Sequence, residues 1–234
     1  MKPRQFFGLS VIYAAVLAGF LAAANLTSAV TTSAVQSIPI ERFHTIVIDP
    51  GHGGEDGGAT SVSGILESRY NLEIALKLQD VFHLLGYSTK MIRTEDISVY
   101  TQGNSIAEKK VSDLKQRVKV VNETQNAVLI SIHQNFYSDG RYSGAQVFYG
   151  KEGDSNALAS ALQSTFRATL NPGSKRREKA AEGIYLMEKT NCTGVLVECG
   201  FLSNHAEEAD LRSEEYQKKI CCVIASTVGT FLTK

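Results

Sequence analysis

The sequence has no net charge of either sign. Its 24 lysine and arginine residues balance 24 aspartate and glutamate residues, so the composition does not indicate nucleic acid or an anionic surface as a partner. No internal repeat or low-complexity tract is visible, so a repeat architecture is not expected. The chain has 234 residues, of which 43% are hydrophobic and 21% charged, values that are ordinary for one globular α/β domain.

Cysteine is scarce and confined to the end of the chain. Cys192, Cys199, Cys221 and Cys222 all lie in the last fifth, and no pair has the CxxC spacing of a cysteine zinc site. An exported protein can form disulfides, but Cys221 and Cys222 are adjacent within an apolar helical pattern. We therefore expect buried thiols that behave as small hydrophobic side chains.

The N-terminus has the pattern of a targeting segment. Lys2 and Arg4 precede the 19 uncharged residues FFGLSVIYAAVLAGFLAAA. Such a segment, followed by small residues, is typical of an export signal, and its length as a helix also nearly spans a bilayer. Residues 1–30 are therefore predicted to be either a cleaved signal peptide or a membrane anchor, followed by a linker at 31–43. Because the basic flank stays inside, both interpretations place the domain at 44–234 outside the cytoplasmic membrane.

Beyond this segment, patterns typical of strands alternate with patterns typical of helices. Four segments have apolar residues at helical spacing, namely residues 67–86, 113–124, 156–170 and 213–231. Six short segments are predicted to be strands: HTIVIDP, YSTKMIR, AVLISIH, GAQVFYG, GIYLM and TGVLVECG. This alternation predicts one α/β domain with a mostly parallel or mixed six-stranded sheet and helices on both faces.

Three of these strands end in polar side chains that a hydrophobic core would reject. His52 follows the first strand in the glycine-rich stretch VIDPGHGGEDGGA, His133 ends AVLISIH and Glu198 ends TGVLVE. Functional sites in open α/β sheets gather at the carboxyl ends of strands. Each residue has a structural alternative, since a histidine can simply be hydrogen-bonded and Glu67 can complement a helix dipole. Together, two imidazoles and a carboxylate are typical of a catalytic zinc site that keeps one position for water.

These residues lie in four motifs, IDPGHGG, LESRYN, SIHQN and VECGFLSN, in that order. With them, the sequence from about Thr45 to the C-terminus resembles the zinc-dependent N-acetylmuramoyl-L-alanine amidases of the Amidase_3 family. The resemblance implies hydrolysis of the amide between the lactyl group of N-acetylmuramic acid and L-alanine of the peptidoglycan stem peptide. It further implies that His52, Glu67 and His133 bind one Zn²⁺ and that Glu198 is the catalytic carboxylate.

The chemistry of these residue types agrees with those roles. Zinc with three protein ligands lowers the pKa of bound water to about 7 and polarises an amide carbonyl. A carboxylate at the end of an apolar strand is expected to have a raised pKa, so Glu198 suits proton transfer to the departing amine. The glycines should give the loop unusual dihedral angles that aim His52, and should let a bulky polymer approach. Asp49 is a candidate hydrogen-bond partner of a ligand imidazole, with a structural turn role as the alternative.

Within the family, the compact length and the segments DLKQRVKVVN, SGAQVFYG and GIYLM are similar to the germination-specific, spore-cortex amidases of endospore formers. Those enzymes remove the peptide so that muramic-δ-lactam can form, which implies a role in spore cortex maturation needed for germination. The alternatives are general cell-wall remodelling or daughter-cell separation. A zinc carboxypeptidase and a non-catalytic wall-binding protein are more distant alternatives.

No inserted inhibitory element is expected beside the site. Only eight residues, FYSDGRYS, separate SIHQN from the next predicted strand, which leaves no room for an autoinhibitory helix there. Control then falls to expression timing, to substrate selectivity or to a partner protein. The resemblance to the spore type makes a lipoprotein partner a candidate, and the predicted loops Thr94–Ser112 and Asn171–Ala181 are candidate contact surfaces, with plain solvated loops as the alternative.

Overall fold

The structure, a computed structural model, describes residues 43–233. The predicted signal or anchor at residues 1–30, with its membrane contact, and the linker up to residue 42 lie outside the described residues. Within residues 43–233, no helix is both long enough and apolar enough to cross a membrane.

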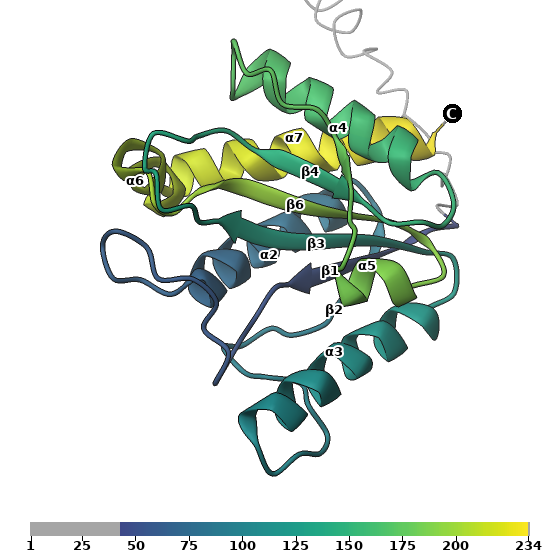
Figure 1. Ribbon diagram of the computed structural model, residues 1–234. Coiled ribbons are helices and arrows are strands. Elements are labelled where there is room, and N and C mark those ends of the chain that lie inside the picture. The colour runs from purple at the N-terminus through teal and green to yellow at the C-terminus, as the bar shows by residue number, and fades with distance from the viewer. Residues whose placement is uncertain (1–42, 234) are drawn as a thin grey trace, which may run out of the picture. The chain divides into compact units, whose positions relative to one another are not determined.

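The described chain alternates between strands and helices (Figure 1). The strands are β1 (Thr45–Pro50), β2 (Ser88–Met91), β3 (Ala127–Asn135), β4 (Gln146–Tyr149), β5 (Lys179–Ala180) and β6 (Thr193–Phe201). The helices are α2 (Glu67–Leu84), α3 (Ile106–Asn122), α4 (Ser155–Thr169), α5 (Tyr185–Lys189), α6 (His205–Arg212) and α7 (Glu214–Leu232).

The six strands form one mixed sheet in the order β2-β1-β3-β6-β4-β5. The strands β2, β1, β3 and β6 run parallel, whereas β4 is antiparallel to β6 and parallel to β5. The central strands β1, β3 and β6 are almost wholly buried, as their continuous apolar sequences require. Because these three strands are parallel neighbours, their carboxyl ends meet at one edge of the sheet. The predicted mixed six-stranded sheet is confirmed.

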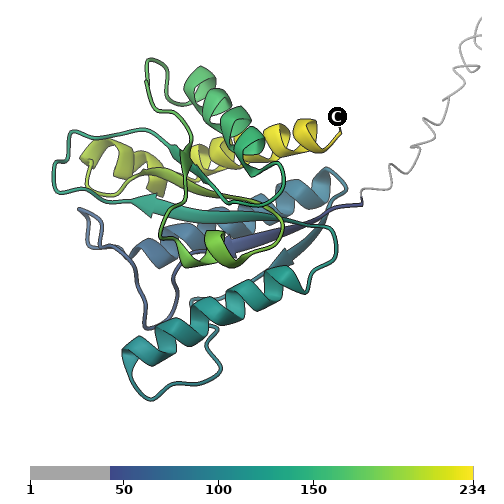
Figure 2. The ribbon, with the colours of Figure 1, turned by 45° about the vertical axis from the view of Figure 1, so that its right-hand side comes forward.

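Helices cover both faces of the sheet, as predicted (Figures 1 and 2). Side chains alternate along each strand, so Ile46 and Ile48 of β1 join the core beneath α2, α4 and α7. Val47, between them, joins a second core that includes Leu186 and Met187 of α5 and Val121 of α3. The sheet is therefore packed between two separate apolar layers.

One predicted strand is wrong. The segment GIYLM contains the short helix α5, and the fifth strand is instead β5, which lies within the predicted loop Asn171–Ala181. Gly183 turns the chain with a φ of 76°, and its N–H donates to the carboxylate of Glu188 at 3.0 Å. A five-residue apolar run alone does not distinguish helix from strand, which is why the sequence pattern was misinterpreted here.

Two further helix boundaries differ from the prediction. Helix α3 begins at Ile106, inside the predicted loop Thr94–Ser112, because Ser105 and Glu108 form a capping box. Helix α6 was not predicted; the side chain of Asn204 accepts from the first free backbone N–H groups of that helix. The exposed loop before α3 is thus shorter than expected.

The cysteines follow the prediction in part. All four are free, and Cys199 and Cys221 are buried among hydrophobic side chains. Cys199 points away from the face that carries Glu198, as strand alternation requires. Cys222, however, is exposed on α7, so the expectation of buried thiols is wrong for this residue.

Candidate metal and catalytic site

His52 follows β1 with a left-handed backbone, at a φ of 59°. This conformation is uncommon for a residue other than glycine and tends to be kept where a site requires it. The neighbouring glycines make room for the site itself. A Cβ at Gly51 would overlap the His133 ring, and one at Gly58 would lie 2.6 Å from the Glu67 carboxylate and 2.7 Å from the His52 ring. The unusual dihedral angles predicted for this loop are present at Gly53, Gly54 and Gly58, and His52 itself also has one.

A buried guanidinium group holds this loop against helix α2. Arg93, which is 3% exposed, donates to the carbonyl oxygens of Pro50, Gly51 and Ser68, each at 2.9 Å. The first two carbonyls precede His52, and the third belongs to the residue after Glu67. One side chain therefore sets the spacing between the loop that carries an imidazole and the helix that carries the carboxylate.

A second buried arginine supports the same loop from α3. Arg117 donates to the carbonyl oxygen of His52 at 2.7 Å and pairs with Asp49 at 2.6 Å. Asp49 also accepts from Ser131 at 2.6 Å. Burial raises the pKa of Asp49, but Arg117 and Ser131 outweigh it, so the pKa is lowered. Among the described residues Asp49 forms no hydrogen bond with either imidazole, so its predicted role as partner of a ligand ring is not seen.

The carboxylate of Glu67 is oriented by hydrogen-bond donors from three segments of the chain. The side chain is buried, and it accepts from the backbone N–H of Ala59 at 3.0 Å and of Gln134 at 3.2 Å. Asn71, one turn along α2, donates to it at 3.2 Å. Three donors from three segments thus fix a charged group that burial alone would disfavour.

The three predicted metal ligands converge on one point. His52, Glu67 and His133 each offer a ligand atom, and these atoms lie within 4.8 Å of one another. The Glu67 oxygens are 3.3 Å from Nε2 of His52 and 3.0 Å from Nδ1 of His133. Burial raises the pKa of Glu67, but the two imidazoles outweigh it and hold the pKa well below its usual range. Two imidazoles and one carboxylate are a donor set that suits zinc.

Glu198 lies beside this cluster on the neighbouring strand. Its Cα is in register with that of His133 across the β3–β6 pair. Its Oε2 atom is buried and has no hydrogen-bond partner among the described residues. Burial raises the pKa of Glu198 to about 7, against the opposing effect of His133, as predicted for a carboxylate at the end of an apolar strand. A cavity of about 240 Å³ is lined by His52, His133 and Glu198 together.

Comparison with known proteins identifies this arrangement. The profile of the Amidase_3 family, described as N-acetylmuramoyl-L-alanine amidase, matches residues 46–229. The chain belongs to this family. The enzyme class expected from the four motifs is thereby confirmed, as is the activity of the family, the hydrolysis of the N-acetylmuramoyl–L-alanine amide of peptidoglycan.

Two relatives and two solved structures illustrate how this amidase compares with others. The germination-specific N-acetylmuramoyl-L-alanine amidase of Bacillus subtilis is 36% identical over 191 residues, which cover 81% of this chain and 80% of the relative. The amidase LytC of the same organism is 28% identical over 178 residues, 75% of this chain but 33% of LytC.

Among structures, the CwlD amidase from Clostridioides difficile, solved in complex with the GerS lipoprotein, has a TM-score of 0.77 and 34% identity. The match covers 81% of this amidase and 98% of that chain. The catalytic domain of CwlV from Bacillus (Paenibacillus) polymyxa has a TM-score of 0.68 and 29% identity, over 81% and 98% of the two chains.

Sequence reasoning missed the groups that support the site. Arg93 follows the second strand and Arg117 lies in α3, and both resemble ordinary surface charges until their burial is known. Asp56 was missed as well; its Oδ1 atom lies 3.0 Å from Nδ1 of His52. The one available signal was an arginine at the end of a predicted strand, since Arg93 ends YSTKMIR.

Proposed function

We propose that this amidase binds one Zn²⁺ through His52, Glu67 and His133 and uses Glu198 to transfer the proton. The observation that carries the proposal is the convergence of these four side chains, with three donor atoms within 4.8 Å of one another and an unpartnered carboxylate oxygen beside them. The glycines at 51 and 58 leave the space that the ligand side chains occupy. The donor set therefore fits the metal.

The residues of the chain have distinct tasks in this proposal. Zinc, when bound, supplies Lewis-acid activation of water and of the amide carbonyl. Ala59, Asn71 and Gln134 hold the Glu67 carboxylate in a fixed orientation. Glu198, with a pKa of about 7, takes up the proton from the attacking water and gives it to the departing amine nitrogen of L-alanine.

We further propose that the biological role is spore cortex maturation, in which removal of the peptide lets muramic-δ-lactam form before germination. This proposal is supported by the similarity to the germination-specific amidase of Bacillus subtilis and to CwlD of Clostridioides difficile. In this role the domain acts outside the cytoplasmic membrane, delivered by residues 1–30 as a signal or an anchor. Because CwlD was solved with a lipoprotein, a lipoprotein partner is part of the proposal, with the segment 94–105 as its contact surface.

The proposal is tested by mass spectrometry of peptidoglycan fragments. The full chain, loaded with Zn²⁺, is incubated with fragments of spore cortex and of vegetative wall. We expect free stem peptides that begin with L-alanine and a preference for cortex fragments. Equal rates on both walls would favour the general remodelling role. Cuts within the stem peptide would indicate a carboxypeptidase, and binding without any product would indicate a wall-binding protein.

A further inference from the structure

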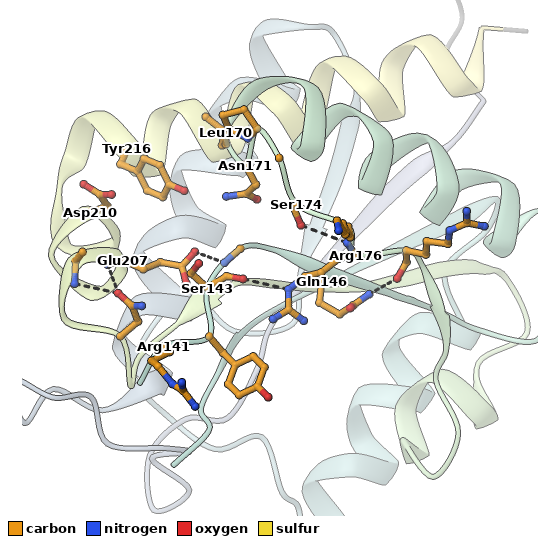
Figure 3. Close-up of a pocket in the computed structure, with 18 of the residues that line it drawn as sticks. Arg141, Ser143, Gln146, Leu170, Asn171, Ser174, Arg176, Glu207, Asp210 and Tyr216 are labelled. Carbon is orange, nitrogen blue, oxygen red and sulfur yellow. Dashed lines mark hydrogen bonds between the residues drawn. The ribbon is translucent and has the colours of Figure 1, made fainter. Parts of the chain in front are cut away.

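Figure 3 shows a depression that is larger than the cavity beside Glu198. It has a volume of about 1130 Å³ and is open to solvent. Its walls come from the loop after β3, from the segment 170–179 between α4 and β5, and from α6 with the start of α7. We call this depression the basic groove. None of its lining residues also lines the metal cavity.

The basic groove is richer in cations than in carboxylates. Five cationic residues line it against three acidic ones, and four of the five lie between residues 175 and 179. Of the acids, Glu207 already accepts from the backbone N–H groups of Gly144 and Phe201, each at 2.8 Å. Lys175 and Arg177 are exposed and have no carboxylate within ion-pair distance among the described residues. These cations are free to meet an anionic ligand.

Arg176 gives the groove a fixed edge. The side chain reaches across the groove and donates from Nε to the carbonyl oxygen of Ser143 at 3.1 Å (Figure 3). Its guanidinium group lies 4.8 Å from the ring centre of Phe201. Tyr142 stacks on the same ring, with 6.3 Å between the ring centres. A planar cation held on an aromatic stack keeps its terminal N–H groups oriented for a carboxylate.

The groove and Glu198 are connected by the neighbouring strands β4 and β6. Gln146, which lines the groove, is the direct Cα partner of Glu198 in the β4–β6 pair. Residues directly opposite in an antiparallel pair lie on the same face of the sheet. Phe201 lies three residues beyond Glu198 on β6, which corresponds to about 10 Å along a strand. An extended peptide covers this distance in about three residues.

We propose that the basic groove binds the stem peptide of the substrate and selects peptides with free carboxylates two or three residues beyond the scissile amide. This inference rests on the proposed amidase site, because that site sets the position of the first stem residue. The ligand class is an acidic peptide covalently joined to the reacting group. The groove acts on substrate affinity and leaves the chemical step to Glu198 and the metal ligands.

The test compares two substrates and two double variants of the full, zinc-loaded chain. The substrates are muropeptide fragments that differ only in whether the stem carboxyl groups are free or amidated. Lys175→Gln with Arg177→Gln removes two exposed cations from the groove. Lys90→Gln with Lys115→Gln removes the same charge from exposed positions on β2 and α3, outside both cavities. Initial rates then give kcat and KM separately, at low and at high salt.

We expect the groove variant to raise KM for the free-acid substrate about three- to tenfold at low salt, since exposed ion pairs are individually weak. The kcat should stay unchanged, and the effect should shrink at high salt. The control variant and the amidated substrate should show no such change. An unaltered KM for the free-acid substrate, or an equal rise in KM for both substrates, would overturn the inference. An unaltered KM is also the result expected if the groove binds a separate acidic protein in place of the stem peptide. If the wild-type chain cleaves neither substrate, the proposed function itself fails.

Discussion

Glu198 is the residue at which stability and activity oppose each other. The residue as a whole is half-buried, but one carboxylate oxygen is buried without a hydrogen-bond partner among the described residues, and burial raises its pKa to about 7. In the unfolded chain the group ionises near 4.5. Between these two values the folded state retains a proton that the unfolded state releases. As the pH rises through this window, the free energy of unfolding therefore falls.

Replacing Glu198 by Gln should remove both the proton transfer and the loss of unfolding free energy at high pH. We expect turnover to drop about 10²-fold or more, while the metal-free variant at pH 8 gains up to about 3 kcal/mol of unfolding free energy, at about 1.4 kcal/mol per pKa unit. Denaturant unfolding at pH 4 and pH 8 measures this gain, which should vanish at pH 4. Zinc analysis is the control. Loss of zinc from Glu198→Gln would mean that Glu198 is a ligand.

Arg93 is expected to act on the metal site without touching it. Lysine cannot reproduce the fork that reaches the carbonyls of Pro50, Gly51 and Ser68. Arg93→Lys should therefore weaken zinc binding about 10- to 100-fold, the usual effect of altering groups that orient metal ligands. Competition with a chromogenic chelator measures the affinity. Arg69→Lys, on the exposed side of α2, is the matched control. Equal affinity in both variants would show that Arg93 serves only the fold.

At the scale of elements, the loop between β1 and α2 needs glycine where the side chain of another element packs directly against its backbone. Gly51→Ala should displace the His133 ring, because the added Cβ would overlap it. We expect reduced zinc content with the sheet intact, measured by metal analysis beside circular dichroism. Gly64→Ala, in the same loop, meets no atom within 4 Å, although its φ of 83° is also unfavourable for alanine. A similar loss of zinc in both variants would attribute the effect to general loop strain.

The accuracy of the sequence predictions also differs between elements. The long strands β1, β3 and β6 were predictable, because continuous apolar runs rich in β-branched residues are typical of buried parallel strands. The start of α3 was readable in principle, since Ser105 and Glu108 have the spacing of a capping box. The succession of β5 and α5 could not be predicted, because a two-residue strand depends on pairing with β4 and not on the pattern of its own residues.

The same distinction applies to the site. His52, Glu67, His133 and Glu198 could be proposed from the sequence because polar groups at the ends of apolar strands and in a first helical turn stand out, and because the family motifs contain them. The supporting arginines depend on contacts between residues far apart in sequence, such as the one from Arg93 to Ser68. No local pattern contains that information.

At the scale of the whole molecule, we expect the domain to fold without its N-terminal segment. Every element of the sheet and both apolar layers lie within the described residues 43–233. A truncated chain that begins at Ile38 should be soluble and unfold cooperatively, as judged by size-exclusion chromatography and thermal denaturation. Insolubility of this chain, with good recovery of the full chain in detergent, would show that the N-terminal segment packs on the domain.

The order of the strands has a consequence for how the domain behaves at high concentration. The two edges of the described sheet are β2, with four residues, and β5, with two. Each carries an exposed lysine, Lys90 on one edge and Lys179 on the other. Short, charged edges offer little backbone to the sheet of another molecule, so they oppose edge-to-edge aggregation. The described domain should therefore have little tendency to pair with other copies through its sheet edges.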